Sequence, residues 1–411
     1  LQDTKALVNQ EMPLYILIAV GASLLVLFLS LESTITPLLF MLGLLFPIAY
    51  NFGTNIFLGQ ISYITEALAT VLQLGVTMDF SIFLLHRYQE EKELRSNNEE
   101  AMVSAICKTM TSISASSLTT IAGFLALCFM QLTLGRDIGL VMAKGVVLGV
   151  ATVVLVLPAL LLIFDEKIEK HKHRTLIPNF EKMNRFIIRH RRVFVAVFLL
   201  LFLPAVYAQS HTAVYYKLDE ALPQDMDSIV ANNKLKNDYD MAASHFVLLR
   251  DDLSSTEMNQ LETSVKDVEG ITSVLSYHAM LGSGIPDFFI PEALRDMLKQ
   301  GGWQMMMVNS EYPAASDQVS VQLEELERII KSYDPEALIT GEAVLTDDLI
   351  DTSAVDFKVT NYISLAAIFL IIMVVFRSLS MPLVLVAAIE LSIFINQGIP
   401  YFTGTVIPFV S

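Results

Sequence analysis

The chain contains 411 residues, of which 54% are hydrophobic and only 17% are charged, and its mean hydropathy is +0.54. A soluble domain of this length would contain far fewer uninterrupted apolar runs, so the composition excludes that class and predicts a polytopic membrane protein. The two cysteines, Cys107 and Cys128, fall on or near one hydrophobic segment and cannot meet along a single helix, which excludes a disulfide framework.

Eight apolar segments of helix length follow one another and predict eight transmembrane helices. They are Pro13–Leu31, Ile35–Phe52, Ile61–Leu85, Ser112–Gln131, Ile138–Phe164, Val193–Ala208, Val359–Phe376 and Pro382–Ile399. The sixth is short and is expected to use interfacial residues in order to span. Because the chain does not begin with Met and stops after an apolar hairpin, we expect an internal piece of a larger protein.

Charge fixes the predicted orientation, because Lys and Arg next to membrane spans stay on the cytoplasmic side. The linker 165–192 carries nine of the 27 Lys and Arg residues, which predicts that it is cytoplasmic. The large polar region 211–357 is then outside and holds the acidic excess behind the net charge of −16. The same threading places further basic residues inside, with Arg136 as a mild exception: Arg87, Lys92, Arg95, Lys108 and Arg377.

Short strands alternate with amphipathic helices inside region 211–357, which predicts a small external α/β domain. The expected elements are strands at His245–Arg250, Ile271–Ser276, Gln304–Val308 and Ala337–Thr340, and helices at Ser255–Val268 and Gln318–Tyr333. An insertion, Pro286–Gln300, has a helical pattern and is bracketed by Gly282, Gly284, Gly301 and Gly302.

An internal repeat is visible at an offset of 345 residues. Its pairs are Ser33 with Ser378, Pro37 with Pro382, Asn51 with Asn396, Gly53 with Gly398, Phe57 with Phe402 and Gly59 with Gly404. Two parallel halves of this kind are common in secondary transporters, whose coupling site lies between the repeats.

Asp79 is the most informative single residue, because it lies inside the third apolar segment. At ~1.5 Å per residue it is roughly 12 Å from Arg87, near the middle of a hydrocarbon core ~30 Å thick. A charge there costs ~2.5–3.5 kcal/mol, so such a group is usually partnered and functional. We interpret Asp79 as a group that couples a proton or ion to transport. The alternative is a permanently neutral carboxyl that forms a structural hydrogen bond with a neighbouring helix.

Residues 75–80 (GVTMDF) with 83–91 (FLLHRYQEE) resemble the fourth transmembrane helix of the MMPL family, which belongs to the resistance–nodulation–division (RND) superfamily of exporters. Residues 117–124 (SLTTIAGF) are similar to its fifth helix, and 157–160 (LPAL) to the end of its sixth. Further matches are Leu222-Pro223, the stretch from Gly341 through Asp351 and Asp356, and residues 376–379 (FRSL). The resemblance covers essentially the whole chain.

The resemblance implies an RND-type helical membrane protein with a ferredoxin-like porter domain. In the twelve-helix family plan, residues 1–12 would end the first external domain and 13–164 would form helices two to six. Residues 165–192 would be the linker, 193–210 helix seven, 211–357 the second external domain, and 358–411 helices eight and nine.

The implied activity is export of lipids and other hydrophobic or amphipathic compounds across the plasma membrane, driven by the proton gradient. The family carries an Asp-Tyr pair on helix four and another on helix ten. Phe80 replaces the first Tyr here, which removes a hydroxyl partner of Asp79 but leaves the carboxylate. The counterpart of Asp79 is expected beyond Ser411.

The resemblance also places hydroxyl side chains of the next helix in a polar pocket around Asp79: Ser116, Ser117, Thr119 and Thr120. Serine and threonine are also ordinary contacts between membrane helices, so packing is the alternative. Four glycines are interpreted as helix-packing positions: Gly75, Gly123, Gly145 and Gly149. Lys144 is expected to be structural and to extend toward the interface. Glu390 is a second titrating acid, a residue that lines a cavity or a satisfied polar contact.

We expect no cofactor or metal, with the proton as coupling ion and sodium as the alternative. The expected partners are membrane lipids and a hydrophobic small-molecule or lipid substrate, with no nucleic acid; monomer and homotrimer both remain open. A second hypothesis is a lipid-sensing or protein-translocation accessory protein of the same superfamily. An intramembrane aspartyl protease needs two close carboxylates, and only Asp79 is well placed, so we expect no enzyme activity.

Overall fold

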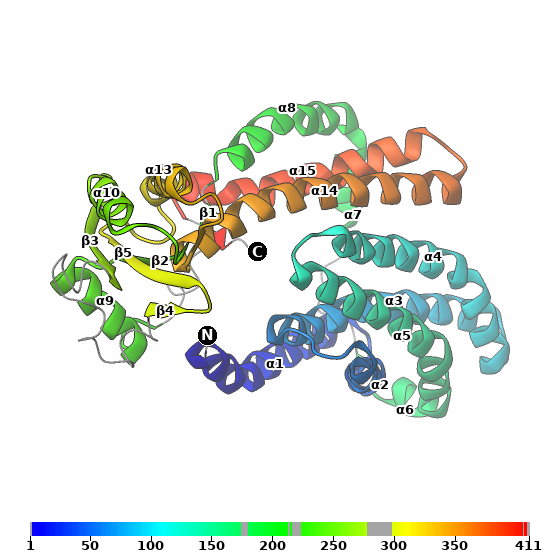
Figure 1. The fold of residues 1–411 in the computed structure, drawn as a ribbon. Coiled ribbons are helices and arrows are strands. Elements are labelled where there is room, and N and C mark those ends of the chain that lie inside the picture. The colour runs from blue at the N-terminus through cyan, green and yellow to red at the C-terminus, as the bar shows by residue number, and fades with distance from the viewer. Residues whose placement is uncertain are drawn as a thin grey trace. The chain divides into compact units, whose positions relative to one another are not determined.

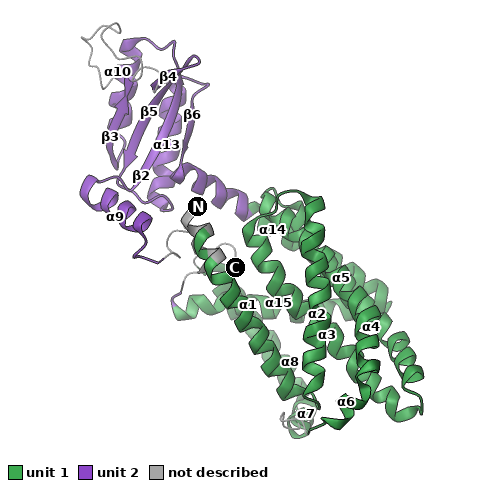
Figure 2. Cartoon of the chain, turned by 90° about the horizontal axis from the view of Figure 1, so that it is seen from below, with its two compact units in different colours: residues 1–212, 355–403 green, residues 213–354, 404–411 purple. Residues whose placement is uncertain are grey.

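The computed structural model describes residues 2–173, 180–212, 214–215, 223–277, 298–405 and 407–408. It contains two compact units, unit 1 with Leu1–Thr212 and Val355–Thr403, and unit 2 with Ala213–Ala354 and Gly404–Ser411 (Figure 2). Several positions singled out in the sequence lie outside the described residues: Leu222, Gly282, Gly284 and most of the insertion Pro286–Gln300.

Unit 1 is built from helices. In the described part of the chain, eight helices are long and apolar enough to cross a membrane, which confirms the predicted membrane fold. They are α1 (Gln2–Ser30), α2 (Ile35–Thr54), α3 (Tyr63–Leu94), α4 (Asn98–Ala126), α5 (Thr133–Ile163), α8 (Arg191–Ser210), α14 (Glu342–Phe376, which begins in unit 2) and α15 (Ser380–Thr403). Short helices lie at the ends of spans: η1 (Asn55–Leu58), η2 (Leu127–Phe129), α6 (Asp165–Lys170) and α7 (Glu181–Arg189).

Several helices are longer than their apolar segments. Helix α1 includes residues 2–12, which the sequence suggested were the end of a soluble region, and it runs through Pro13. Ser62 and Asn97 cap α3 and α4, since their side chains accept the backbone N–H groups of Ile64 and Glu99. Such caps satisfy the first amides of a helix in water, and the Asn97 cap starts α4 in polar residues before the predicted Ser112. Helix α3 begins close to its predicted start and is longer at its other end, where it continues through polar residues to Leu94.

Helix α5 is the centre of the first helix group, because it packs against α2, α3 and α4. Their core includes Phe40, Leu84, Met102 and Leu157, each almost completely buried. In a second group, α8 packs along α15. A Cβ added to Gly398 of α15 would lie 2.9 Å from the Cβ of Ala208, so the two backbones approach closely there.

Unit 2 has the ferredoxin-like βαββαβ topology. Its elements are β2 (Ala243–Arg250), α10 (Ser255–Lys266), β3 (Ile271–Ser276), β5 (Trp303–Ser310), α13 (Asp317–Tyr333) and β6 (Leu338–Gly341). The strand order is β3-β5-β2-β6, all neighbours are antiparallel, and α10 and α13 lie together on one face (Figure 1). The predicted α/β domain class is thereby confirmed.

The core of unit 2 follows from strand periodicity, since alternate residues of β2 are buried. Val247, Leu249 and Met306 contact Leu261 of α10 and Leu326 of α13 in one apolar cluster. The sequence pattern missed α9 (Asp227–Tyr239) and the two-residue strands β1 (Val214–Tyr215), β4 (Lys299–Gln300) and β7 (Ile407–Pro408). β4 lies at the end of the predicted helical insertion and pairs with β5.

Candidate functional site in the membrane helices

Helix α3 has two different faces. The face that packs against α4 and α5 includes Gln73, Thr77 and Phe80, all almost completely buried. The opposite face is exposed and carries a stripe at helical spacing, namely Leu72, Gly75, Asp79, Phe83 and His86. The packing of α3 against α4 and α5 therefore turns Asp79 away from their shared core.

The Asp79 carboxylate forms no hydrogen bond or ion pair with another described residue. Phe80, at the position of the family tyrosine, points into the core and is only 3% exposed. It contacts the apolar cluster that contains Leu84 and Met102. Consecutive helical residues point about 100° apart, so the phenyl ring serves the core of the bundle and the carboxylate does not.

The predicted hydroxyl pocket is not formed by hydrogen bonds to Asp79 among the described residues. Ser117 Oγ donates to the Ser114 carbonyl at 3.1 Å, and both Thr119 Oγ1 and Thr120 Oγ1 donate to the Ser116 carbonyl, at 2.7 and 2.9 Å. Each hydroxyl thus bonds to its own helix α4, as is common for Ser and Thr in membrane helices. A role for them near Asp79 stays a prediction.

The four predicted packing glycines have different surroundings. A Cβ added to Gly149 would lie 2.5 Å from Thr77 Oγ1, so α5 and α3 approach closely there. An added Cβ at Gly123 would make an ordinary contact, 3.9 Å from Ser364 Oγ of α14. At Gly75 no described atom lies within 4 Å of the added Cβ, so this position of the exposed stripe has no packing partner among the described residues.

A polar cluster missed by sequence analysis joins α2, α3 and α5. Asn51 Nδ2 donates to Gln73 Oε1 at 2.8 Å, and Lys144 Nζ donates to the Asn51 carbonyl at 3.0 Å and to Asn55 Oδ1 at 2.6 Å. The ammonium group therefore meets the carbonyl end of α2, where a cation is favourable. A Cβ at Gly145 would lie 2.8 Å from Asn51 Nδ2, so the glycine makes room for the cluster.

The signal for this cluster was present but ambiguous. Gln73 and Thr77 are four residues apart on α3, and Gly145 and Gly149 are four apart on α5. Such spacing places each pair on one helix face. The sequence did not indicate that these two faces meet each other.

The end of α3 next to α4 is held by a buried carboxylate. Glu91 is 1% exposed and accepts hydrogen bonds from Lys108 Nζ at 2.6 Å and Ser104 Oγ at 2.8 Å. Arg87 and Arg95, one turn before and after it, each lie 3.3 Å from its oxygens. The spacing of four residues between acid and base was the signal that predicts these contacts.

A second carboxylate ties the same end of α3 to α6. Asp165 accepts hydrogen bonds from Lys92 Nζ at 2.8 Å, Tyr88 Oη at 3.1 Å and Asn98 Nδ2 at 2.8 Å. Lys92 also pairs with Glu169 at 2.8 Å, and this contact lowers the pKa of Glu169. The charged residues at this end of α3, of which the basic ones were used above only for topology, thus form two hydrogen-bonded networks.

Asp356 connects α14 to α5. Its carboxylate is 1% exposed and accepts the backbone N–H groups of Gln131 and Leu132, both at 2.9 Å. These residues immediately precede α5, so Asp356 caps that helix from another helix. Glu390 of α15, by contrast, is half-buried and forms no hydrogen bond or ion pair with a described residue.

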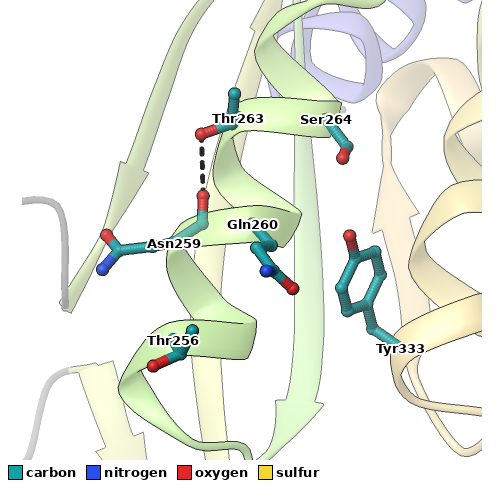
Figure 3. A pocket seen from close by; sticks show the side chains of 6 residues that line it. All are labelled: Thr256, Asn259, Gln260, Thr263, Ser264 and Tyr333. Atoms are coloured by element: carbon teal, nitrogen blue, oxygen red, sulfur yellow. Dashed lines mark hydrogen bonds between the residues drawn. The ribbon is translucent and has the colours of Figure 1, made fainter.

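Unit 2 carries a shallow pocket of about 400 Å³ beside α10 (Figure 3). Its lining residues bear hydroxyl, amide and phenol groups, and they are Thr256, Asn259, Gln260, Thr263, Ser264 and Tyr333. The pocket is open to solvent, whereas sites for apolar ligands are enclosed, so we place the candidate site in the membrane helices.

Comparison with known proteins shows that the chain is similar to membrane proteins. The model of the MMPL family matches residues 1–195 and 219–407. The putative membrane protein ActII-3 of Streptomyces coelicolor is 25% identical over 344 residues, which are 82% of this chain and 45% of that protein. The siderophore exporter MmpL5 of Mycobacterium tuberculosis is 27% identical over 139 residues, 33% of this chain and 14% of the exporter.

A solved structure, that of SecDF, a translocon-associated membrane protein of Thermus thermophilus, has the same fold with a TM-score of 0.55. It is 17% identical, and the match covers 97% of this chain and 48% of SecDF. The chain spans about half the length of the curated relatives that it matches along most of its own length. Since the family match extends over nearly all of the sequence, the chain belongs to the MMPL family.

Proposed function

We propose that this chain is part of a secondary exporter that moves lipids or other hydrophobic compounds out across the plasma membrane, driven by the proton gradient. Membership of the MMPL family supports transport, and one matched relative is named as a siderophore exporter. In this proposal unit 2 lies outside the cell, as the basic linker 165–192 predicts.

The proposal rests on one observation, that Asp79 is exposed and has no hydrogen-bonding partner among the described residues. A carboxylate near the middle of a span costs ~2.5–3.5 kcal/mol, and hydrogen bonds usually offset this cost. Asp79 has no such partner among the described residues and lies on the exposed face of α3. A group with this placement can bind a proton when the face meets lipid and release it when the face meets water or a cation.

The opposite face of α3 supports a coupling role. Glu91 and Asp165 hold the inner end of the helix, and Gln73 joins its outer half to α2. A change of charge at Asp79 would therefore act on a helix that is firmly attached to its neighbours. Each charge that crosses the field is worth ~2.3 kcal/mol per 100 mV, which is enough to bias a transport cycle.

The test is export by the full-length protein in proteoliposomes with an imposed pH gradient. Asp79→Asn should abolish gradient-driven export, and Asp79→Glu should retain part of it, because only the second variant can exchange a proton. Glu90→Gln is the matched control, since Glu90 is an exposed acid on the same helix and should tolerate the change. Full gradient-driven export by Asp79→Asn would remove the proposal.

The same proteoliposomes distinguish proton from sodium coupling and test the accessory-protein hypothesis. Replacing the pH gradient by a sodium gradient identifies the coupling ion. A protein that binds lipid or a secretion channel but transports no small molecule under either gradient would instead fit the accessory-protein hypothesis. No proteolytic step is proposed, because the described membrane helices bring no second carboxylate into contact with Asp79.

A further inference from the structure

Helix α7 exposes an apolar surface outside the membrane spans. It has nine residues, and only His190 separates it from α8. Phe180 before it is 48% exposed, and Met183 and Phe186 within it are 50% and 56% exposed. Large apolar side chains exposed in series usually mark a surface that another phase or molecule covers.

The residues of α7 are mostly segregated by type, with Ile188 as the apolar residue outside the stripe. At about 100° per residue, Phe180, Met183 and Phe186 share one side of the helix with Ile187. The exposed basic residues lie together beside this stripe, namely Lys182, Arg185 and Arg189. This is the pattern of a helix that lies in the plane of a membrane surface, with its basic side chains directed to the headgroups.

Chain continuity places α7 at a membrane surface. It lies between the end of α5 and the beginning of α8, which starts with Arg191 and Arg192. The Phe186 ring contacts the Phe194 ring edge-on, with centroids 6.3 Å apart, and Phe194 itself is 42% exposed on α8. The apolar stripe of α7 therefore continues into an exposed apolar surface of α8.

We infer that α7, with Arg191 and Arg192, is a binding site for anionic lipid headgroups at the bilayer surface. The apolar stripe requires a hydrocarbon interior, and the five basic side chains require negative charge above it. An anionic leaflet supplies both, whereas an acidic protein segment supplies only the second. Binding at this site would fix the depth at which the 20-residue span α8 enters the bilayer.

The insertion of α7 can be tested with a single fluorescent reporter. Trp303 is the only tryptophan, so a Trp303→Phe background allows one new tryptophan to be read in the full-length protein. Phe186→Trp lies on the apolar stripe, whereas Ile188→Trp, about 160° away, is the matched control. In nanodiscs with brominated lipids, strong quenching is expected only at position 186, which would lie ~5–10 Å into the headgroup boundary. Equal quenching at both positions would overturn the inference.

The charge requirement is tested by a pair of double variants. Arg185→Gln with Arg189→Gln should abolish the enrichment of phosphatidylglycerol over phosphatidylcholine around the purified protein and make the quenching independent of lipid charge. Arg328→Gln with Lys331→Gln removes two cations from an exposed face of α13 and should change neither. Unchanged phosphatidylglycerol enrichment in the α7 variant would contradict the site. Neither readout needs transport, so a failed export assay would leave this result standing.

Discussion

Asp79 and Glu91 are two carboxylates on the same helix with opposite surroundings. Glu91 is buried and accepts hydrogen bonds from Lys108 and Ser104 between two flanking arginines. Asp79 is exposed and has no hydrogen-bonded partner among the described residues. Glu91 therefore holds α3 in place, whereas Asp79 is the acid that we propose changes its charge. The sequence alone presents both as charges near a membrane span.

The strongest test of this comparison removes the paired acid. Glu91→Ala should give the largest fall in the melting temperature of the series, because it leaves Arg87, Arg95 and Lys108 gathered around an empty position. Thermal unfolding of the purified protein in detergent measures the effect. Glu90→Ala is the control, since Glu90 is exposed and its ion pair with Arg87 should contribute little. Equal melting temperatures for the two variants would show that burial of Glu91 does not matter.

Asp356 extends the comparison to an acid that is paired with backbone rather than with cations. Asp356→Ala leaves the N–H groups of Gln131 and Leu132 without their acceptor, which should cost about 1.5–3 kcal/mol of unfolding free energy. Denaturant unfolding in detergent measures this loss. Asp351→Ala, at an exposed position of the same helix α14, should change the stability much less. A loss below that of the control would exclude Asp356 as a cap of α5.

The fold was largely predictable because each element carries a local signal. Apolar runs located the eight spans, and alternation located strands such as Ile271–Ser276. Predicted ends were wrong where a helix continues beyond its apolar part, as α4 does toward its Asn97 cap and α3 does to Leu94. Helix α7 was missed because its nine residues lie in a linker whose basic charge was explained by topology alone.

The sequence identified the residue at the candidate site, but it did not predict which residues surround it. Hydropathy identified Asp79, yet only the packing of α3 on α5 determines that it faces away from the bundle. The same holds for Lys144, whose hydrogen bonds to Asn51 and Asn55 at the end of α2 depend on how α5 packs against that helix. Contacts between helices depend on which helix faces pack against each other. A single sequence shows which residues share a face but not which two faces meet.

His245 of unit 2 tests a third case, a buried titratable group without an opposite charge. It is fully buried on β2, and this burial lowers its pKa below the ordinary value. The unfolded chain therefore binds a proton more readily, so the stability of unit 2 should be complete above about pH 6.5 and fall as the pH decreases from there. The slope cannot exceed ~1.4 kcal/mol per pH unit, the value for one proton.

Fluorescence of Trp303, on the strand paired with β2, reports unfolding of this unit between pH 8 and pH 5. Glu169 and Glu257 have lowered pKa values and therefore titrate below this range. His245→Gln should abolish the slope. A slope that persists in this variant would assign the pH dependence to another group.

The smallest expected effect concerns Asp79 itself and completes the comparison. Because its carboxylate contacts no described partner, Asp79→Asn should change the unfolding free energy by no more than about 0.5 kcal/mol, as at other unpartnered positions. Thermal unfolding in detergent, beside Glu91→Ala, provides the measurement. A destabilisation as large as that of Glu91→Ala would mean that Asp79 is structural. Unchanged stability together with lost export would separate the coupling role of this acid from any role in holding the helices together.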